Sequence, residues 1–277
     1  MGFLSNLIPK DRFIRNMGWM GVGELGIRVS RLLATVILAR LLSPKDYGLA
    51  AIVLMTNEFV RVFTRNGIGD KIVQADAEEL SEVCQTAWSL NWVIGASLCL
   101  VQIAASFVIG RIYNDSSLIL PIILVSFSYL IYPLAMVQTA LIRRENRLKI
   151  FSLTYLVSVV TDNLLTGALA LLGWGMWAIV LPKLLVAPVW VVMMLRYEVW
   201  RPARTFTLKR WSHVMSFGSR ILGVELLNTF RESVDYLFIG RMIGLKALGV
   251  YYFAFNAGLG LSISVISALS ILSLIHI

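Results

Sequence analysis

Ionisable and polar side chains recur at helical spacing inside three stretches of the sequence that are otherwise apolar. A spacing of three or four residues places such side chains on one face of a helix. The nine residues are Glu24, Arg28 and Arg31 in the first stretch, Glu58 and Arg61 in the second, and Glu225, Asn228, Glu232 and Asp235 in the third. Ionisable residues in apolar spans are costly and mark functional sites by default. We therefore predict that these residues line a polar cavity and bind substrate.

The signs of these charges indicate what they could bind. Arg28, Arg31 and Arg61 suit a phosphate, because a guanidinium group is planar, always charged and able to hold two phosphate oxygens at once. The third stretch supplies carboxylates, and we expect the acidic and basic stripes to pair when the cavity is closed and to separate when substrate enters. The alternative is that neighbouring charges, such as Glu58 and Arg61, form ion pairs that only hold the helices together.

Asp162 and Lys183 form a separate pair of charges. They lie about eleven and eight residues on either side of the turn Gly173-Trp174-Gly175. A turn this short joins two antiparallel helices, so the two side chains lie at similar depth on neighbouring helices. We predict a structural ion pair here.

The composition requires a membrane protein. Of the 277 residues, 58% are apolar and only 15% are charged, whereas soluble domains average about 45–50% apolar and about 25% charged. Apolar stretches of about 20 residues, long enough to cross a hydrocarbon core of about 30 Å, recur throughout the chain. We predict an all-α, polytopic membrane protein with eight transmembrane helices, at roughly 17–40, 47–65, 84–110, 117–141, 150–172, 175–195, 214–240 and 247–272.

The loops between these helices predict the orientation. The N-terminal segment and the loops on its side carry most of the lysine and arginine, for example in "RRENRLK" and "RPARTFTLKR". Because basic loops stay in the cytoplasm, the N-terminus is predicted to be cytoplasmic. The formal net charge of +9 therefore indicates membrane orientation, and we expect no nucleic-acid partner.

Neither a metal site nor a cofactor is predicted. Cys84 and Cys99 fall on one predicted helix, about 22 Å apart at 1.5 Å per residue, which is too far for a disulfide. His213 and His276 are distant in sequence and have no companion ligands. The phosphate-binding pattern G-x-x-x-x-G-K-[ST] of nucleotide-driven pumps is also absent from the sequence.

An internal repeat becomes visible when the sequence is shifted by 201 positions. Charged and glycine residues then coincide, notably Arg40 with Arg241, Lys45 with Lys246, and Gly48 with Gly249; Glu24 coincides with Glu225, and Arg31 corresponds to Glu232. The first and seventh helices are therefore equivalent, and one repeat unit contains six helices. An even number of spans makes the two units parallel, as in many secondary transporters, whose substrate site lies between the repeats near the midplane.

The corner "RLLSPKDYG" at residues 40–48, followed by "NGIGD" at 66–70, resembles the signature of a known family. These are the polysaccharide-export flippases of the Wzx/WzxC type, in the MATE-like multidrug/oligosaccharidyl-lipid/polysaccharide (MOP) superfamily of transporters. The specific likeness covers roughly residues 20–75. Members of the family have twelve or more spans in two six-helix lobes.

The resemblance implies the following division of the chain. Residues 1–16 are a cytoplasmic or interfacial segment, 17–196 a six-helix lobe, 197–213 a cytoplasmic linker, and 214–277 the start of a second lobe that is truncated at its C-terminal side. It also implies a function: alternating access that moves an undecaprenyl-pyrophosphate-linked oligosaccharide across the bacterial inner membrane, for lipopolysaccharide or exopolysaccharide production.

Two other functions are alternatives to polysaccharide export. In a cation-coupled multidrug exporter of the same superfamily, Glu24, Glu58 and Asp235 would bind Na⁺ or H⁺, but the arginines nearby would repel a cationic drug. A membrane enzyme, such as a polysaccharide polymerase or ligase, would carry a large external loop with catalytic charges. No predicted external loop exceeds about ten residues and no nucleophile–base pair is visible, so we expect no enzyme.

Overall fold

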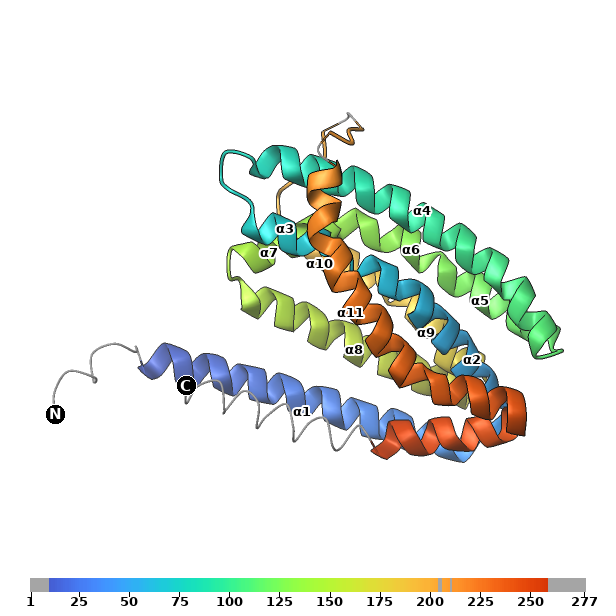
Figure 1. The fold of residues 1–277 in the computed structure, drawn as a ribbon. Coiled ribbons are helices and arrows are strands. Elements are labelled where there is room, and N and C mark those ends of the chain that lie inside the picture. The colour runs from blue at the N-terminus through green and yellow to red at the C-terminus, as the bar shows by residue number, and fades with distance from the viewer. Residues whose placement is uncertain (1–9, 204–205, 210, 259–277) are drawn as a thin grey trace, which may run out of the picture.

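The computed structural model describes residues 10–203, 206–209 and 211–258, and within them the side chains of all except residues 10–25, 148 and 212–221. Every regular element in the described part of the chain is a helix (Figure 1). The predicted all-α class is therefore confirmed.

The helices follow one another with short connections. Those of the first half are α1 (Lys10–Leu41), α2 (Pro44–Arg61), η1 (Val62–Thr64), α3 (Ile68–Gln74) and α4 (Leu80–Ile112). Those that follow are η2 (Ser116–Leu118), α5 (Ile119–Ser126), α6 (Ser128–Ile131), η3 (Tyr132–Ala135), α7 (Met136–Arg144), α8 (Leu148–Leu171), α9 (Trp177–Leu185), α10 (Ala187–Tyr197), α11 (Trp211–Phe238) and the π-helical stretch η4 (Ile239–Ile243). A last helix occupies residues 245–258, and the rest of the predicted span 247–272 lies outside the described residues.

Four of these spans are long and apolar enough to cross a membrane: Leu80–Ile112, Ser116–Arg144, Lys149–Leu171 and Trp177–Tyr197. Large apolar side chains such as Leu100 and Leu164 are about two-thirds exposed on them. Such exposure is costly in water and favourable in lipid. The chain is thus a multi-pass membrane protein.

Two of the spans are interrupted, and a proline lies at or just before two of the three breaks. Within Ser116–Arg144 the helix changes at Phe127 and again at Pro133, and Trp177–Tyr197 changes at Val186, after Pro182. Proline has no backbone N–H to donate to the preceding turn, so it loosens a helix at that point. The short helix α3, at the end of the predicted loop after α2, was not predicted.

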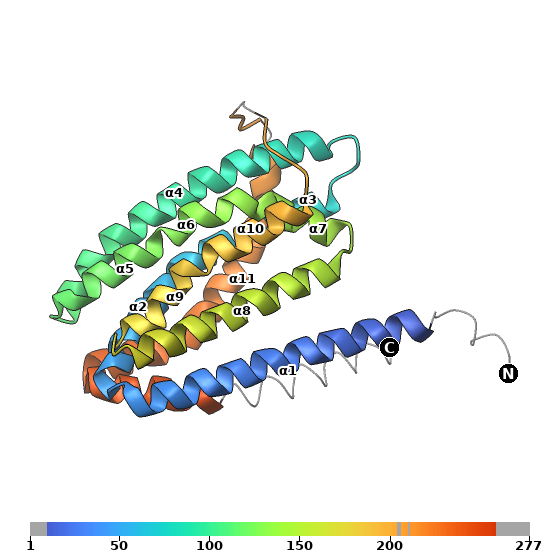
Figure 2. The ribbon, with the colours of Figure 1, turned by 180° about the vertical axis from the view of Figure 1, so that it is seen from behind.

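The bundle has α1 at one edge, where it packs along α8 (Figures 1 and 2). The main apolar core lies between α2, α5 and α9, around Ile52, Ile122 and Val180, which are fully buried. Leu248 of the last helix enters the same core. Helix α11 crosses the bundle and packs against α2, α3 and α4 (Figure 1).

The corner before α2 is built by a capping box. The Ser43 hydroxyl accepts a hydrogen bond from the Asp46 amide at 3.2 Å, and the Asp46 carboxylate accepts one from the Ser43 amide at 3.1 Å. Pro44 occupies the first turn, where its missing N–H costs nothing. These residues explain why α2 begins abruptly at Pro44.

The two corners related by the internal repeat lie against each other. A Cβ atom added to Gly48 would meet the Leu245 carbonyl oxygen at 2.0 Å, and one added to Gly249 would meet the Pro44 carbonyl oxygen at 1.8 Å. Leu245 is the repeat equivalent of Pro44, as Gly249 is of Gly48. The same contact is therefore made twice, with the partners exchanged, as in a two-fold interface.

Candidate functional site

Glu58 and Arg61 of α2 form an ion pair, with Arg61 Nη2 2.6 Å from Glu58 Oε2. Each side chain is 44% exposed. A charge pair in this setting is favourable only where water or a polar ligand reaches it, because hydrocarbon does not solvate it. The pair is consistent with both predictions made for it, a substrate contact and a brace within the helix.

Asp162 of α8 and Lys183 of α9 are also brought together. Lys183 Nζ donates a hydrogen bond of 2.6 Å to Asp162 Oδ2. The side chains are 18% and 38% exposed respectively. The pair is thus not sealed between its two helices.

A buried hydrogen-bond network lies next to the Glu58–Arg61 ion pair on α2. The Tyr129 hydroxyl lies 2.9 Å from the Asn57 carbonyl oxygen, 3.0 Å from Asn57 Oδ1 and 3.0 Å from Gln102 Oε1. Gln102 Nε2 in turn donates to the Ile122 carbonyl oxygen at 3.0 Å. Because Asn57 precedes Glu58, this network fixes the rotation of α2 at the ion pair. Sequence reasoning missed it, since uncharged polar residues in spans are common.

The residues of the predicted acidic stripe contact different partners along α11. Glu225 Oε2 lies 2.5 Å from Arg65 Nη1, which joins α11 to the residue after η1. Asp235 accepts hydrogen bonds from the Tyr251 hydroxyl and, at 3.0 Å, from the Tyr236 amide. Asn228 lies partly buried between them on the same helix.

The basic stripe lies on α1, the helix at one edge of the bundle (Figure 1). Helix α1 packs along α8, where Asn163 Nδ2 donates to Ser30 Oγ at 2.9 Å. Arg28 is partly buried and Arg31 is exposed, while the side chain of Glu24 lies outside the described residues. Glu232 Oε1 lies 3.7 Å from Arg231 Nη2, on its own helix. The predicted pairing of Arg31 with Glu232 stays a prediction.

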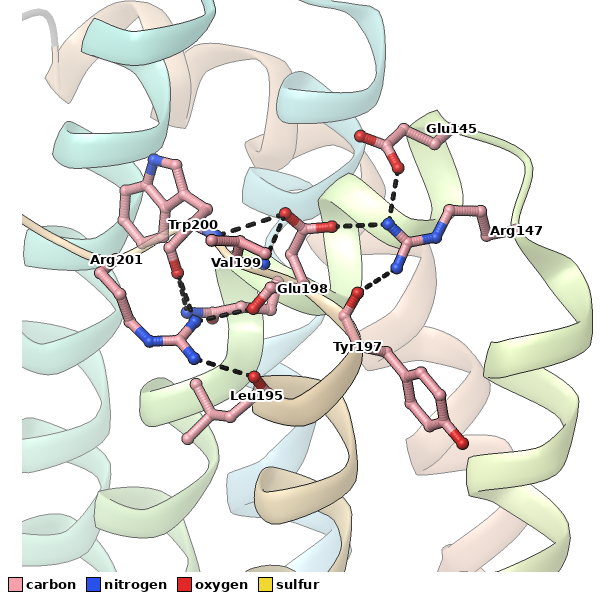
Figure 3. A network of polar contacts seen from close by, with 9 residues as sticks. Glu145, Arg147, Leu195, Tyr197, Glu198, Val199, Trp200 and Arg201 are labelled. Carbon is pink, nitrogen blue, oxygen red and sulfur yellow. Dashed lines mark hydrogen bonds and ion pairs between the residues drawn. The ribbon is translucent and has the colours of Figure 1, made fainter.

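A second network joins the loop before α8 to the segment after α10 (Figure 3). Arg147 Nη1 lies 2.8 Å from Glu145 Oε2 and 3.0 Å from Glu198 Oε2, and Nη2 donates to the Tyr197 carbonyl oxygen. Arg201 donates to the carbonyl oxygens of Glu198 and Leu195 at 2.7 Å and 2.8 Å. These arginines, expected as orientation signals, also tie the loops to each other.

The predicted linker is bound to α4. Gln85 Oε1 accepts a hydrogen bond from the Ala203 amide at 2.9 Å, and Gln85 Nε2 donates one to the Ala203 carbonyl oxygen at 3.2 Å. Ser89 Oγ accepts from the Thr207 amide at 3.2 Å, and Thr86 Oγ1 donates to the Lys209 carbonyl oxygen at 2.9 Å. The segment leading into α11 is therefore held along α4 rather than free.

At the turn after α4, Asp115 accepts hydrogen bonds from the hydroxyl and the amide of Ser117, at 2.6 Å and 3.0 Å. Its carboxylate also lies 4.0 Å from Lys45 Nζ. The pKa of Asp115 is lowered below its usual value, chiefly because the Ser117 hydroxyl donates a hydrogen bond to the charged carboxylate.

In the part of the chain that the structure describes, no three histidine, cysteine, aspartate or glutamate residues gather to hold a metal ion.

Comparison with known proteins identifies related sequences. Residues 37–271 match the family described as "Polysaccharide biosynthesis protein". The chain is 23% identical over 246 residues to the teichuronic acid biosynthesis protein TuaB of Bacillus subtilis, covering 86% of this chain and 50% of that protein. It is 24% identical over 244 residues to the succinoglycan biosynthesis transport protein ExoT of Rhizobium meliloti, covering 86% and 48%.

A third relative, the lipopolysaccharide biosynthesis protein WzxC of Escherichia coli, is 20% identical over 253 residues, covering 89% of this chain and 50% of that protein. The chain thus spans about half the length of the curated relatives it matches. No solved structure matches it significantly.

Proposed function

The chain belongs to the polysaccharide biosynthesis protein family, and from this membership we propose that it is part of a flippase that moves a lipid-pyrophosphate-linked oligosaccharide across a bacterial membrane. The match over residues 37–271 carries the proposal. The relatives are named for teichuronic acid, succinoglycan and lipopolysaccharide, which favours a polysaccharide precursor over a drug. A transport protein among them favours translocation over catalysis.

The arginines supply the phosphate-binding chemistry of the proposal. Arg61 is partly exposed next to Glu58, so a pyrophosphate can compete with the carboxylate for the same guanidinium group. Arg28 and Arg31 add two more such groups on α1. The proposed substrate-binding set is the nine predicted residues, Glu24, Arg28, Arg31, Glu58, Arg61, Glu225, Asn228, Glu232 and Asp235.

The contacts of α11 and the last helix support alternating access. The contacts that join these helices to the preceding six include the Arg65–Glu225 ion pair and the double contact at Gly48 and Gly249. Small shifts at such contacts can switch a bundle between two packings. We take residues 17–196 as the first lobe and the helices after the linker as part of a second. The N-terminus would lie on the cytoplasmic side of a bacterial inner membrane. A coupling ion, H⁺ or Na⁺, would act through the carboxylates.

The test is export in cells deleted for the gene and complemented with the full-length protein. Arg31→Glu should abolish surface polysaccharide, because it places a negative charge where a phosphate binds. Lipid-linked oligosaccharide should then accumulate on the cytoplasmic side. Lys209→Glu, on the exposed linker, is the matched charge reversal and should export normally.

The pairing of the stripes is tested with a second substitution. If Arg31 and Glu232 meet in the closed state, adding Glu232→Arg to Arg31→Glu should restore closure, measured as protection of a cysteine label placed on α11. Normal export by Arg31→Glu at wild-type protein levels would refute the proposed role of Arg31.

A further inference from the structure

We propose that a pocket at the turn between α4 and α5 binds the phosphate group of an anionic phospholipid. The pocket has a volume of about 300 Å³, and its lining includes Phe107, Arg111, Asn114, Asp115, Ser116 and Ile119. It lies at the end of α4 opposite to the bound linker, where α4 and α5 meet (Figure 1). Phospholipid is available to any multi-pass membrane protein, so this site is independent of the proposed function.

The length of α4 places the pocket at the level of lipid headgroups. The helix has 33 residues and is therefore about 50 Å long, whereas the hydrocarbon core is about 30 Å thick. Its first turns carry the polar linker, which binds Gln85 and Ser89, so these turns lie outside the hydrocarbon. A core that begins after Ser89 ends about 20 residues later, just before Arg111. Arg111 therefore lies where the phosphates of one bilayer leaflet lie.

The charges at the pocket favour an anionic ligand. Arg111 is exposed and, in the described part of the chain, belongs to no ion pair. The Asp115 carboxylate is held by Ser117 and lies 4.0 Å from Lys45 Nζ, so Lys45 balances its charge. Together Arg111, Asp115 and Lys45 carry one net positive charge. The Arg111 guanidinium group can hold two phosphate oxygens at once.

The other lining residues fit the rest of a phospholipid headgroup. The Asn114 amide and the Ser116 hydroxyl can donate hydrogen bonds to phosphate or ester oxygens, and the Asp115 carboxylate can accept one from a headgroup hydroxyl. Phe107 and Ile119 supply apolar surface to the same pocket, and Phe107 is 53% exposed on α4. Acyl chains can therefore continue along α4 from the bound headgroup.

A role of Arg111 as an orientation signal alone does not explain the pocket. An arginine at a membrane boundary extends its charged end into water and needs no neighbouring polar groups to do so. Here Arg111 shares one pocket with an amide, a hydroxyl and a carboxylate. The volume of about 300 Å³ is at the lower limit of ligand pockets, which hold about 300–1,000 Å³. The pocket therefore fits a headgroup rather than a whole lipid.

The experiment measures lipid binding to the full-length protein by native mass spectrometry. The probes are phosphatidylglycerol, whose headgroup is anionic and carries hydroxyl groups, and phosphatidylcholine, whose headgroup is zwitterionic and has no hydrogen-bond donor. We expect Arg111→Gln to bind phosphatidylglycerol about tenfold more weakly than wild type, as for the loss of one charge-assisted hydrogen bond. Its affinity for phosphatidylcholine should stay within about twofold of wild type.

Two further variants separate the pocket from general electrostatics. Arg40→Gln is the matched control, because Arg40 is an exposed arginine five residues before Lys45 and does not line the pocket. It should bind both lipids as wild type does. Ser116→Trp fills the pocket without changing any charge and should weaken phosphatidylglycerol binding by a similar factor to Arg111→Gln. It also tests the site if Arg111→Gln fails to fold.

Three results would overturn the lipid site. One is wild-type affinity of Arg111→Gln, or of Ser116→Trp, for phosphatidylglycerol. A second is an equal loss in Arg111→Gln and Arg40→Gln, because any positive charge at this end of the bundle would then attract the lipid. The third is displacement of phosphatidylglycerol by inorganic phosphate at equal concentration, because the ligand would then be free phosphate.

Discussion

Replacing Gly48 by alanine should separate the two corners that the internal repeat places together. The new Cβ atom would lie 2.0 Å from the Leu245 carbonyl oxygen, whereas an ordinary carbon–oxygen contact is about 3.3 Å, so the backbones must move apart by roughly 1.3 Å. Gly249→Ala requires roughly 1.5 Å by the same comparison, because its Cβ would lie 1.8 Å from the Pro44 carbonyl oxygen.

The cost can be worked out from the packing. Forcing an extra methyl group into a tight contact costs about 1–3 kcal/mol, and alanine returns up to about 1 kcal/mol through its helix propensity. A net loss of about 2 kcal/mol lowers Tm by about 4–8 °C for a chain of this size. Both glycines belong to one contact, so the double variant should lose little more than the worse single variant.

The assay is thermal unfolding of the full-length protein in detergent, followed by tryptophan fluorescence. Gly223→Ala is the matched control, because Gly223 lies on α11 with no atom within 4 Å of the added Cβ. It should be neutral or slightly stabilising. If Gly48→Ala unfolds at the same temperature as Gly223→Ala, the reasoning about the corner is wrong.

Three further experiments test other contacts. Tyr129→Phe removes the one hydroxyl hydrogen that three oxygens of Asn57 and Gln102 share. It leaves a buried acceptor without its donor and should cost about 1–3 kcal/mol in thermal unfolding, whereas Tyr155→Phe on an exposed ring should cost little; equal costs would contradict the network. A double-mutant cycle of Arg65→Ala and Glu225→Ala should give a coupling energy of about 0.2–1 kcal/mol, because both side chains are partly exposed; zero coupling would remove this pair as a link to α11. The Asp115 pKa is lowered on folding, so its stabilisation is present above about pH 4 and is lost as pH falls through the folded-state value. The difference in Tm between wild type and Asp115→Asn should therefore be constant above about pH 5 and shrink below pH 4, and a difference that grows below pH 4 would contradict the assignment.

Local patterns predicted the helices but only part of their arrangement. Apolar length located the predicted spans, each of which falls on helix where the structure describes it. Counting residues from the turn at 173–175 placed Asp162 and Lys183 at similar depth, and they lie 2.6 Å apart. Both results depend only on residues that lie close together in the sequence.

The remaining arrangement depends on contacts between residues far apart in sequence. The repeat suggested that the stripes on α1 and α11 face each other, and this pairing stays a prediction; the structure shows α1 packed on α8 and Arg65 beside Glu225. Likewise, Gln85 binds Ala203 across 118 positions. A single sequence carries no periodic signal for such pairs, since Gln85 bonds to backbone groups of Ala203, which every residue type except proline offers.

The exchanged contacts at the Gly48 and Gly249 corners also bear on ancestry. If the two halves arose from one shorter chain, that ancestor would have met a second copy of itself here, with each glycine under the neighbouring carbonyl oxygen of the other copy. Gene fusion would then have converted an association between two molecules into a fold within one. After such a fusion the two glycines are separate positions of one chain, and each still lies against the backbone of the other corner.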